Sequence, residues 1–127
     1  MTAEELKLRT KRFSIEIINL VEKLPNSNTI RIVANQIARS GTSVGANYRA
    51  VCRARSDREF VSKMNIVLEE ADETLFWLEI IREKKWVLDG EIENVWKEGN
   101  ELTAIFVSSL KTVNNRIYSK QSKQSEI

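Results

Sequence analysis

The four residues Ser56-Asp57-Arg58-Glu59 decide the course of this 127-residue chain. They have the pattern of a capping box, in which the serine hydroxyl accepts from the amide three residues later and the glutamate reaches back. Apolar residues recur at helical spacing on both sides of the box. The pattern therefore predicts two helices, over about 29–55 and 56–85, with almost no loop between them and with antiparallel directions.

Two further helices follow from the breakers on either side. The segment Pro25-Asn26-Ser27-Asn28 ends a helix over about 3–24, and Asp89-Gly90 precedes a last helix that runs to about 118. The remaining residues, 119–127, are polar, have no apolar period and are expected to be disordered. We therefore expect an all-α fold, a single up-down-up-down antiparallel four-helix bundle over 1–118 with a tail.

Composition supports a globular helical protein. The chain has one proline and four glycines, and its residues are 42% hydrophobic and 30% charged. A single cysteine excludes an intramolecular disulfide, and no stretch approaches the eighteen apolar residues of a membrane span. The charged N-terminus lacks the apolar core of a signal peptide. We expect a cytoplasmic protein with no membrane contact.

The net charge of +2 hides an uneven distribution. Residues 23–56 contain six basic residues and no acidic residue. Four of the arginines, Arg31, Arg39, Arg49 and Arg53, fall within about 80° of one another on a helical wheel at ~100° per residue. A guanidinium group binds phosphate through two parallel hydrogen bonds and stays charged. The stripe predicts binding to the backbone of a nucleic acid, RNA or DNA, with RNA favoured.

A second explanation of these arginines stays open. Residues 57–101 carry thirteen acidic residues against six basic ones. The arginines can pair with acids on a neighbouring helix or on another subunit, which would make the chain a protein-binding scaffold whose arginines close subunit interfaces. The acids available for such pairs are Glu69, Glu70, Asp72, Glu73 and Glu79.

Gly41 and Gly45 lie inside the predicted second helix. A glycine there costs about 1 kcal/mol relative to alanine, so two of them indicate a packing requirement. The spacing lacks the lysine of a phosphate-binding loop, and no strand precedes it. We expect these glycines to let a neighbouring helix approach closely.

Apolar residues also lie away from the core faces of the first and third helices. Single exposed apolar residues are common, but two stripes on two helices indicate contact with other subunits. The alternative is a core that is broader than usual. We expect an oligomer interface, with Trp77 as its anchor. The two stripes comprise Leu8, Ile15 and Ile18 on the first helix and Ile66, Phe76, Trp77 and Ile80 on the third.

Catalysis has little support in the sequence. There is no histidine, which removes the commonest general base and the Glu-x-x-His pattern of di-iron bundles. The acids at 69–73 spread over about 160° of the helical wheel at ~100° per residue, so they favour a solvated or arginine-paired face over a metal site. Cys52 lies at the edge of an apolar face and is expected to be a small core residue. We expect no enzyme activity, no cofactor and no metal.

Two motifs resemble a known family, the bacterial four-helix-bundle proteins encoded by intervening sequences in 23S ribosomal RNA genes. The similarity covers all of the chain except the tail. The residues that carry it are Arg39-Ser40 with Ser43-Val44-Gly45-Ala46-Asn47, then Phe60-Val61-Ser62-Lys63-Met64 and Glu70-Ala71-Asp72-Glu73-Thr74-Leu75-Phe76-Trp77-Leu78. The chain departs from the family at Tyr48-Arg49-Ala50, where many members resemble Ile-Ala-Glu-Gly, and is more basic there.

The resemblance implies an up-down bundle that assembles into an oligomeric ring, most often a homopentamer. It also implies a relationship to the accessory variability determinant of diversity-generating retroelements, a basic pentamer that binds nucleic acid and a reverse transcriptase. No biochemical activity comes with the family itself. Function must therefore be argued from the site.

Overall fold

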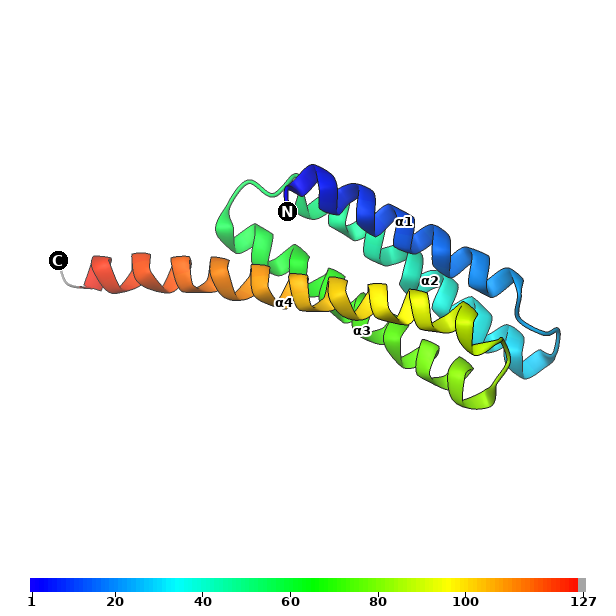
Figure 1. The fold of residues 1–127 in the computed structure, drawn as a ribbon. Helices are drawn as coiled ribbons and strands as arrows, with labels where there is room; N and C mark the ends of the chain where they lie inside the picture. The colour runs from blue at the N-terminus through cyan, green and yellow to red at the C-terminus, as the bar shows by residue number, and fades with distance from the viewer. Residues whose placement is uncertain (126–127) are drawn as a thin grey trace.

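The computed structural model describes residues 1–125, which form four α-helices and no other regular element. They are α1 (Ala3–Glu22), α2 (Asn28–Val51), α3 (Asp57–Lys84) and α4 (Asp89–Ser125). Each helix runs back along the one before it (Figure 1), and the extensive contacts join α1 to α2, α2 to α3 and α3 to α4. The predicted all-α, up-down antiparallel bundle is confirmed.

Serine and threonine caps start the first three helices. The hydroxyls of Thr2, Ser27 and Ser56 each accept a hydrogen bond of 3.1 Å from the amide three residues later. At Ser56 only this half of the expected capping box forms. The carboxylate of Glu59 lies 3.1 Å from the Lys63 ammonium group instead of bonding back to the cap, within the described residues.

The connection between α2 and α3 is longer than predicted. Helix α2 ends at Val51, not near residue 55. Its last turn tightens, because the amides of Arg53 and Ala54 bond to carbonyls three residues earlier, at 3.1 and 3.0 Å. The chain needs residues 52–56 to cross from one helix axis to the next, so Arg53 lies in this connection and not on the helix.

Large apolar side chains from all four helices fill the core. Phe13, Ile37, Leu78 and Phe106 are at most 1% exposed. The rings of Tyr48 and Phe106 stack with their centroids 6.3 Å apart, which joins α2 to α4. The buried serine and threonine hydroxyl groups have hydrogen-bond partners within the bundle; they belong to Thr10, Ser14, Ser40 and Thr74.

Helices α1 and α2 approach each other closely at two glycines. A Cβ atom added to Gly41 would lie 2.7 Å from Cγ2 of Ile17, and one added to Gly45 would lie 2.8 Å from Oγ of Ser14. Neither distance is compatible with a side chain. The absence of side chains at these two positions sets the separation of the two helices.

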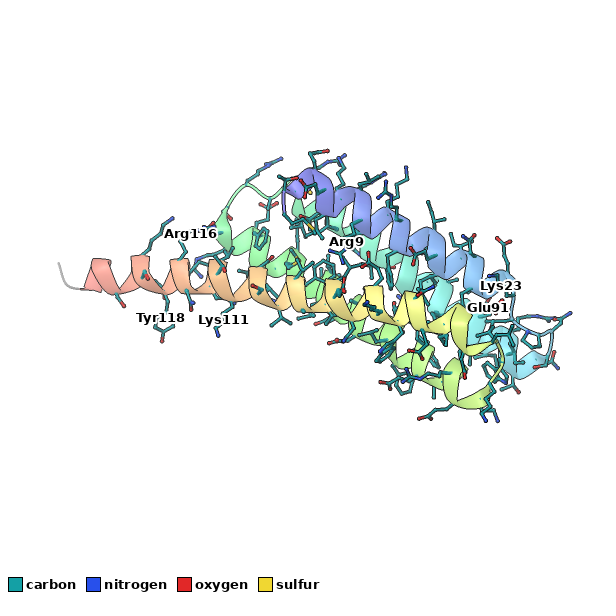
Figure 2. The ribbon with its side chains drawn as sticks, viewed as in Figure 1. Arg9, Lys23, Glu91, Lys111, Arg116 and Tyr118 are labelled. Atoms are coloured by element: carbon teal, nitrogen blue, oxygen red, sulfur yellow. The ribbon has the colours of Figure 1, made fainter. Side chains whose placement is uncertain are left out.

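Helices α1 and α4 form the loosest side of the bundle, and polar groups span it. Arg9 lies 2.6 Å from carboxylate oxygens of both Glu98 and Glu101, and Lys23 lies 3.7 Å from Glu91 (Figure 2). These contacts hold α4 against α1 near each end of α1.

Helix α4 is longer than the others and projects beyond them (Figure 1). Residues 119–125, for which the sequence predicts disorder, continue the helix, because no glycine or proline follows Gly99 and serine, lysine and glutamine tolerate helical geometry. The rest of the predicted tail, residues 126–127, lies outside the described residues. Within 1–125, no helix combines the length and apolar character that a membrane span requires.

Candidate nucleic-acid interface

The four arginines of the predicted stripe are all exposed, but their surroundings differ. Arg31 donates to the side-chain oxygen of Asn26 over 3.2 Å at the start of α2. Arg39 pairs with acids of α3. Arg49 and Arg53 have no acidic partner within the described residues. The structure therefore divides the stripe into parts with different surroundings.

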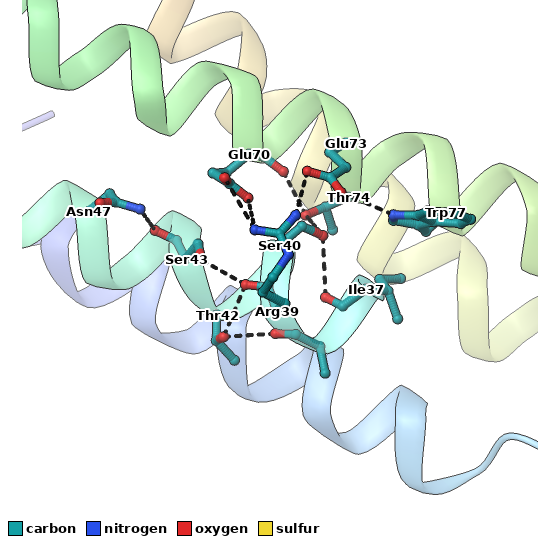
Figure 3. Close-up of polar contacts among 11 residues, drawn as sticks. Ile37, Arg39, Ser40, Thr42, Ser43, Asn47, Glu70, Glu73, Thr74 and Trp77 are labelled. Carbon is teal, nitrogen blue, oxygen red and sulfur yellow. Dashed lines mark hydrogen bonds and ion pairs between the residues drawn. The ribbon is translucent and has the colours of Figure 1, made fainter. Parts of the chain in front are cut away.

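Arg39 joins α2 to α3 (Figure 3). Its guanidinium group lies 3.2 Å from Glu70 and 2.6 Å from Glu73, and the indole nitrogen of Trp77 also donates to Glu73, over 3.5 Å. The hydrogen bond from Arg39 lowers the pKa of the Glu73 carboxyl group below its ordinary value. For this one arginine, pairing with a neighbouring helix is the correct explanation.

The arginines that have no acidic partner, Arg49 and Arg53, line a groove between α1 and α2. Its volume is 460 Å³, and Lys11 lines it from α1 opposite Arg49 and Arg53. No acidic side chain among those that the structure describes lines it. Small residues form the rest of the lining, namely Ser14, Thr42, Gly45, Ala46 and Ala50. The three cationic groups therefore surround a shallow space that an anionic group can enter.

A second hollow adjoins this groove toward the N-terminus of α1. It has a volume of 470 Å³ and shares Lys11 and Arg49 with the groove, while Lys7 and Leu8 extend it along α1. Glu4 and Glu5 form its acidic end. The basic surface thus runs from Arg53 to Lys7 across two helices, and we call Lys7, Lys11, Arg49 and Arg53 the basic patch.

The sequence did not single out Lys7 and Lys11. Their spacing of four residues, which puts them on the same side of α1, was a signal that could have found them. Only the packing of α1 against α2 brings them beside Arg49. Conversely, Arg31 belongs to the other end of α2 and does not line the groove.

Five of the seven residues predicted for an oligomer interface are exposed apolar side chains. On α1 these are Leu8, Ile15 and Ile18, which we call the α1 stripe, at 49%, 47% and 41% exposure. On α3 they are Ile66 and Phe76, at 45% and 52%. The other two residues of the α3 stripe, Trp77 and Ile80, are half-buried.

Trp77 packs partly against the core, and its ring meets Phe76 edge-on with centroids 5.1 Å apart. Phe76 is thus the more exposed member of the pair. Ile32 of α2, which the sequence analysis did not select, is 64% exposed.

The groups considered for catalysis do not assemble into a centre. Cys52 is exposed, not the small core residue that its sequence position predicts, because α2 ends at Val51 and the chain turns away from the core there. Among the side chains that the structure describes, no three of the metal-ligating types come together in a way that could hold a metal ion. Two of the acids at 69–73, Glu70 and Glu73, pair with Arg39.

Comparison with known proteins places this fold and these motifs in one family. Residues 5–108 match the sequence profile of the 23S rRNA-intervening sequence proteins. The chain belongs to the 23S rRNA-intervening sequence protein family. The match begins in the first turn of α1 and ends partway along α4, so it includes the glycine pair and both exposed stripes.

A solved structure agrees with this assignment. It is that of a protein of unknown function from the S23 ribosomal protein family of Bacteroides thetaiotaomicron, with a TM-score of 0.77 and 34% sequence identity. The similarity covers 84% of this chain and 98% of that one. No curated protein matches the chain.

Proposed function

We propose that this member of the 23S rRNA-intervening sequence family is a non-enzymatic, self-assembling bundle that binds the phosphate backbone of RNA through its basic patch. The observation that carries the proposal is the groove itself. Lys11 of α1, Arg49 of α2 and Arg53 of the connection after α2 line one space, and no acidic side chain lines that space among the described residues. Binding would involve phosphates and not base edges, since no aromatic or amide side chain among the described ones lines the groove.

The geometry suits a flexible backbone. Arg49 and Arg53 are four residues apart, and Lys11 faces them from the neighbouring helix. Small residues form the rest of the lining and leave room beside the cationic groups, so that a phosphate can reach two of them together. The family name contains 23S rRNA, which makes RNA the nucleic acid to test before DNA.

Self-assembly is the second part of the proposal. Five apolar side chains of the α1 and α3 stripes are each more than 40% exposed and gather on two helices, whereas the exposed apolar residues of an ordinary monomer are scattered. A homo-oligomer would cover them. The family resemblance makes a pentameric ring the assembly to expect, and a ring would multiply the basic patch, so that several weak phosphate contacts act on one RNA.

A salt titration of RNA binding tests the phosphate contacts. The double variant Arg49→Gln/Arg53→Gln should bind a single-stranded RNA more weakly than the wild type. The slope of log K against log salt should also fall in magnitude by about 1.4, at ~0.7 for each lost phosphate contact. Fluorescence anisotropy from 25 to 300 mM salt gives both quantities.

A matched control removes two charges elsewhere. Lys97 and Lys111 are exposed on α4, and Lys111 projects from the edge of α4 away from α1 (Figure 2). The Lys97→Gln/Lys111→Gln variant has the same net charge as the test variant and should keep the wild-type slope. Absence of RNA affinity in 25 mM salt, or equal slopes for the two double variants, would refute the proposal.

The scaffold without a nucleic-acid role is the second candidate, and the Arg39 contacts with Glu70 and Glu73 favour it. They demonstrate that an arginine of this stripe can serve protein packing. Under this explanation Arg49 and Arg53 pair with acids of another subunit. The double variant Arg49→Gln/Arg53→Gln would then lose assembly mass in light scattering, while wild type and variant would both fail to bind RNA.

A further inference from the structure

The two apolar stripes lie on either side of α2. Leu8 of the α1 stripe lines the same hollow as Arg49 of α2. On the opposite side, Trp77 of the α3 stripe donates to Glu73, which pairs with Arg39 of α2. Each stripe therefore lies on the outer side of its own helix, at the edge next to α2. The surface around the α1 stripe (the α1 face) and the surface around the α3 stripe (the α3 face) are separate surfaces of one chain.

The surroundings of the stripes carry opposite charges. Residues 7–18, which hold the α1 stripe, contain four basic residues and one acid, and one of the basic residues, Arg9, pairs with Glu98 and Glu101 of α4. Residues 66–83, which hold the α3 stripe, contain six acids and one basic residue. That basic residue, Arg82, turns away to α4, where it lies 4.7 Å over the ring of Trp96. The acidic character of the α3 face is therefore only partly offset, by Arg39.

We propose that these two faces bind each other in successive copies, so that the α1 stripe of one subunit packs against the α3 stripe of the next. The partner of each face is a second copy of this chain. This inference rests on the self-assembly in the proposed function and adds which surfaces meet and in which sense. The contact is head-to-tail, because each subunit uses a different face toward each of its two neighbours.

Charge decides against the symmetric alternatives. A contact of two α1 faces would bring basic groups together, and a contact of two α3 faces would bring acidic groups together, which is costly at an interface. The α1–α3 contact joins unlike charges around an apolar centre. The α3 stripe, about 21 Å from Ile66 to Ile80 at 1.5 Å per residue, is long enough to cover the α1 stripe, about 15 Å from Leu8 to Ile18. Head-to-tail contacts that close on themselves produce a ring.

The position of α2 between the stripes has a consequence for the assembly. Successive subunits joined through the α1 and α3 faces all turn α2 toward the same side. The basic patches of the subunits then lie side by side around this face of the assembly, which is where the proposed RNA contact requires them.

A mixing experiment tests the pairing. Ile15→Glu blocks the α1 face and Phe76→Glu blocks the α3 face; both side chains are exposed, so the fold should survive, as far-UV circular dichroism will verify. Each variant alone should be monomeric in light scattering. Mixed in equal amounts, they should form a 1:1 dimer of twice the 14.7-kDa chain mass, because one intact face of each kind remains. Val107→Glu, at an exposed apolar site on α4, should keep the wild-type mass.

The outcomes separate the possibilities. Variants that stay monomeric after mixing, or that keep the wild-type mass when alone, overturn the head-to-tail pairing and leave the RNA contact of the proposed function unaffected. A wild type that is monomeric overturns both the pairing and the proposed self-assembly. If either variant fails to fold, Leu8→Glu and Ile66→Glu at the same two faces repeat the test under the same criteria.

Discussion

The Ser14 hydroxyl donates a hydrogen bond of 2.9 Å to the main-chain carbonyl of Gly41, which brings a side chain of α1 into contact with the backbone of α2. Such a contact requires a helix surface without side chains. Gly41 and Gly45 supply that surface, so replacing either glycine should disturb the packing of α1 against α2.

Gly41→Ala should destabilise the protein. The new Cβ atom would lie 2.7 Å from Cγ2 of the buried Ile17 and could not be accommodated without a shift of α1. Overpacking of this kind costs about 1–3 kcal/mol, against a gain of up to about 1 kcal/mol from replacing a helical glycine. The free energy of unfolding in urea should fall by about 1–2 kcal/mol.

Gly90→Ala is the matched control for this substitution. Gly90 is also helical, but no atom lies within 4 Å of an added Cβ. The propensity gain alone remains, so stability should stay the same or rise by up to about 1 kcal/mol. Equal effects of the two substitutions would contradict a packing role for Gly41.

The course of the chain could be predicted because it depends on local signals. The capping serines and Pro25 have their effects within a few residues, and apolar periodicity identifies the core faces. The end of α2 could not be predicted in this way, because the residues that follow Val51 tolerate a helix and only the crossing to α3 ends it. The exposure of Cys52 follows from the same cause.

The candidate site could be predicted only in part for a similar reason. A helical wheel groups Arg39 with Arg49, but it contains no information on which neighbour each one faces. Tertiary packing places Glu73 beside Arg39 and Lys11 beside Arg49. The different surroundings of Arg39 and Arg49 thus depend on how α1, α2 and α3 pack together.

Ser40 and Thr74 form a buried hydroxyl pair between α2 and α3, with 2.8 Å between their oxygens. Thr74→Val keeps the shape but leaves Ser40 with only a long bond of 3.4 Å to the Ile37 carbonyl. We expect a loss of about 1–3 kcal/mol in the free energy of unfolding. Ser40→Ala/Thr74→Val should cost about 1 kcal/mol less than the sum of the single variants. Additive effects in this double-mutant cycle would argue against the pair.

The Arg39 contact should make stability depend on acid pH. Arg39 lowers the pKa of Glu73 in the folded chain below its ordinary value of 4.5. The stabilisation is therefore complete above about pH 4.5 and is lost as the pH falls through the folded pKa. The stability difference between wild type and Arg39→Met should shrink on acidification from pH 7 to pH 3, as measured by urea unfolding. The Arg31→Met variant, which has no acidic partner to lose among the described residues, should differ from wild type by a constant amount.

Tyr48 should make stability depend on alkaline pH, in the opposite sense. Burial, with a smaller contribution from nearby Cys52, raises its pKa from 10.0 to about 12. The folded chain holds this proton more tightly than the unfolded chain, so stability is complete below about pH 10 and falls as the pH rises toward 12. The loss should be on the order of 2 kcal/mol. Tyr48→Phe keeps the stacking with Phe106 and removes the ionisation. Its stability should therefore decline less than that of wild type between pH 9 and 11.5, and parallel declines would mean that Tyr48 ionises as readily when folded as when unfolded.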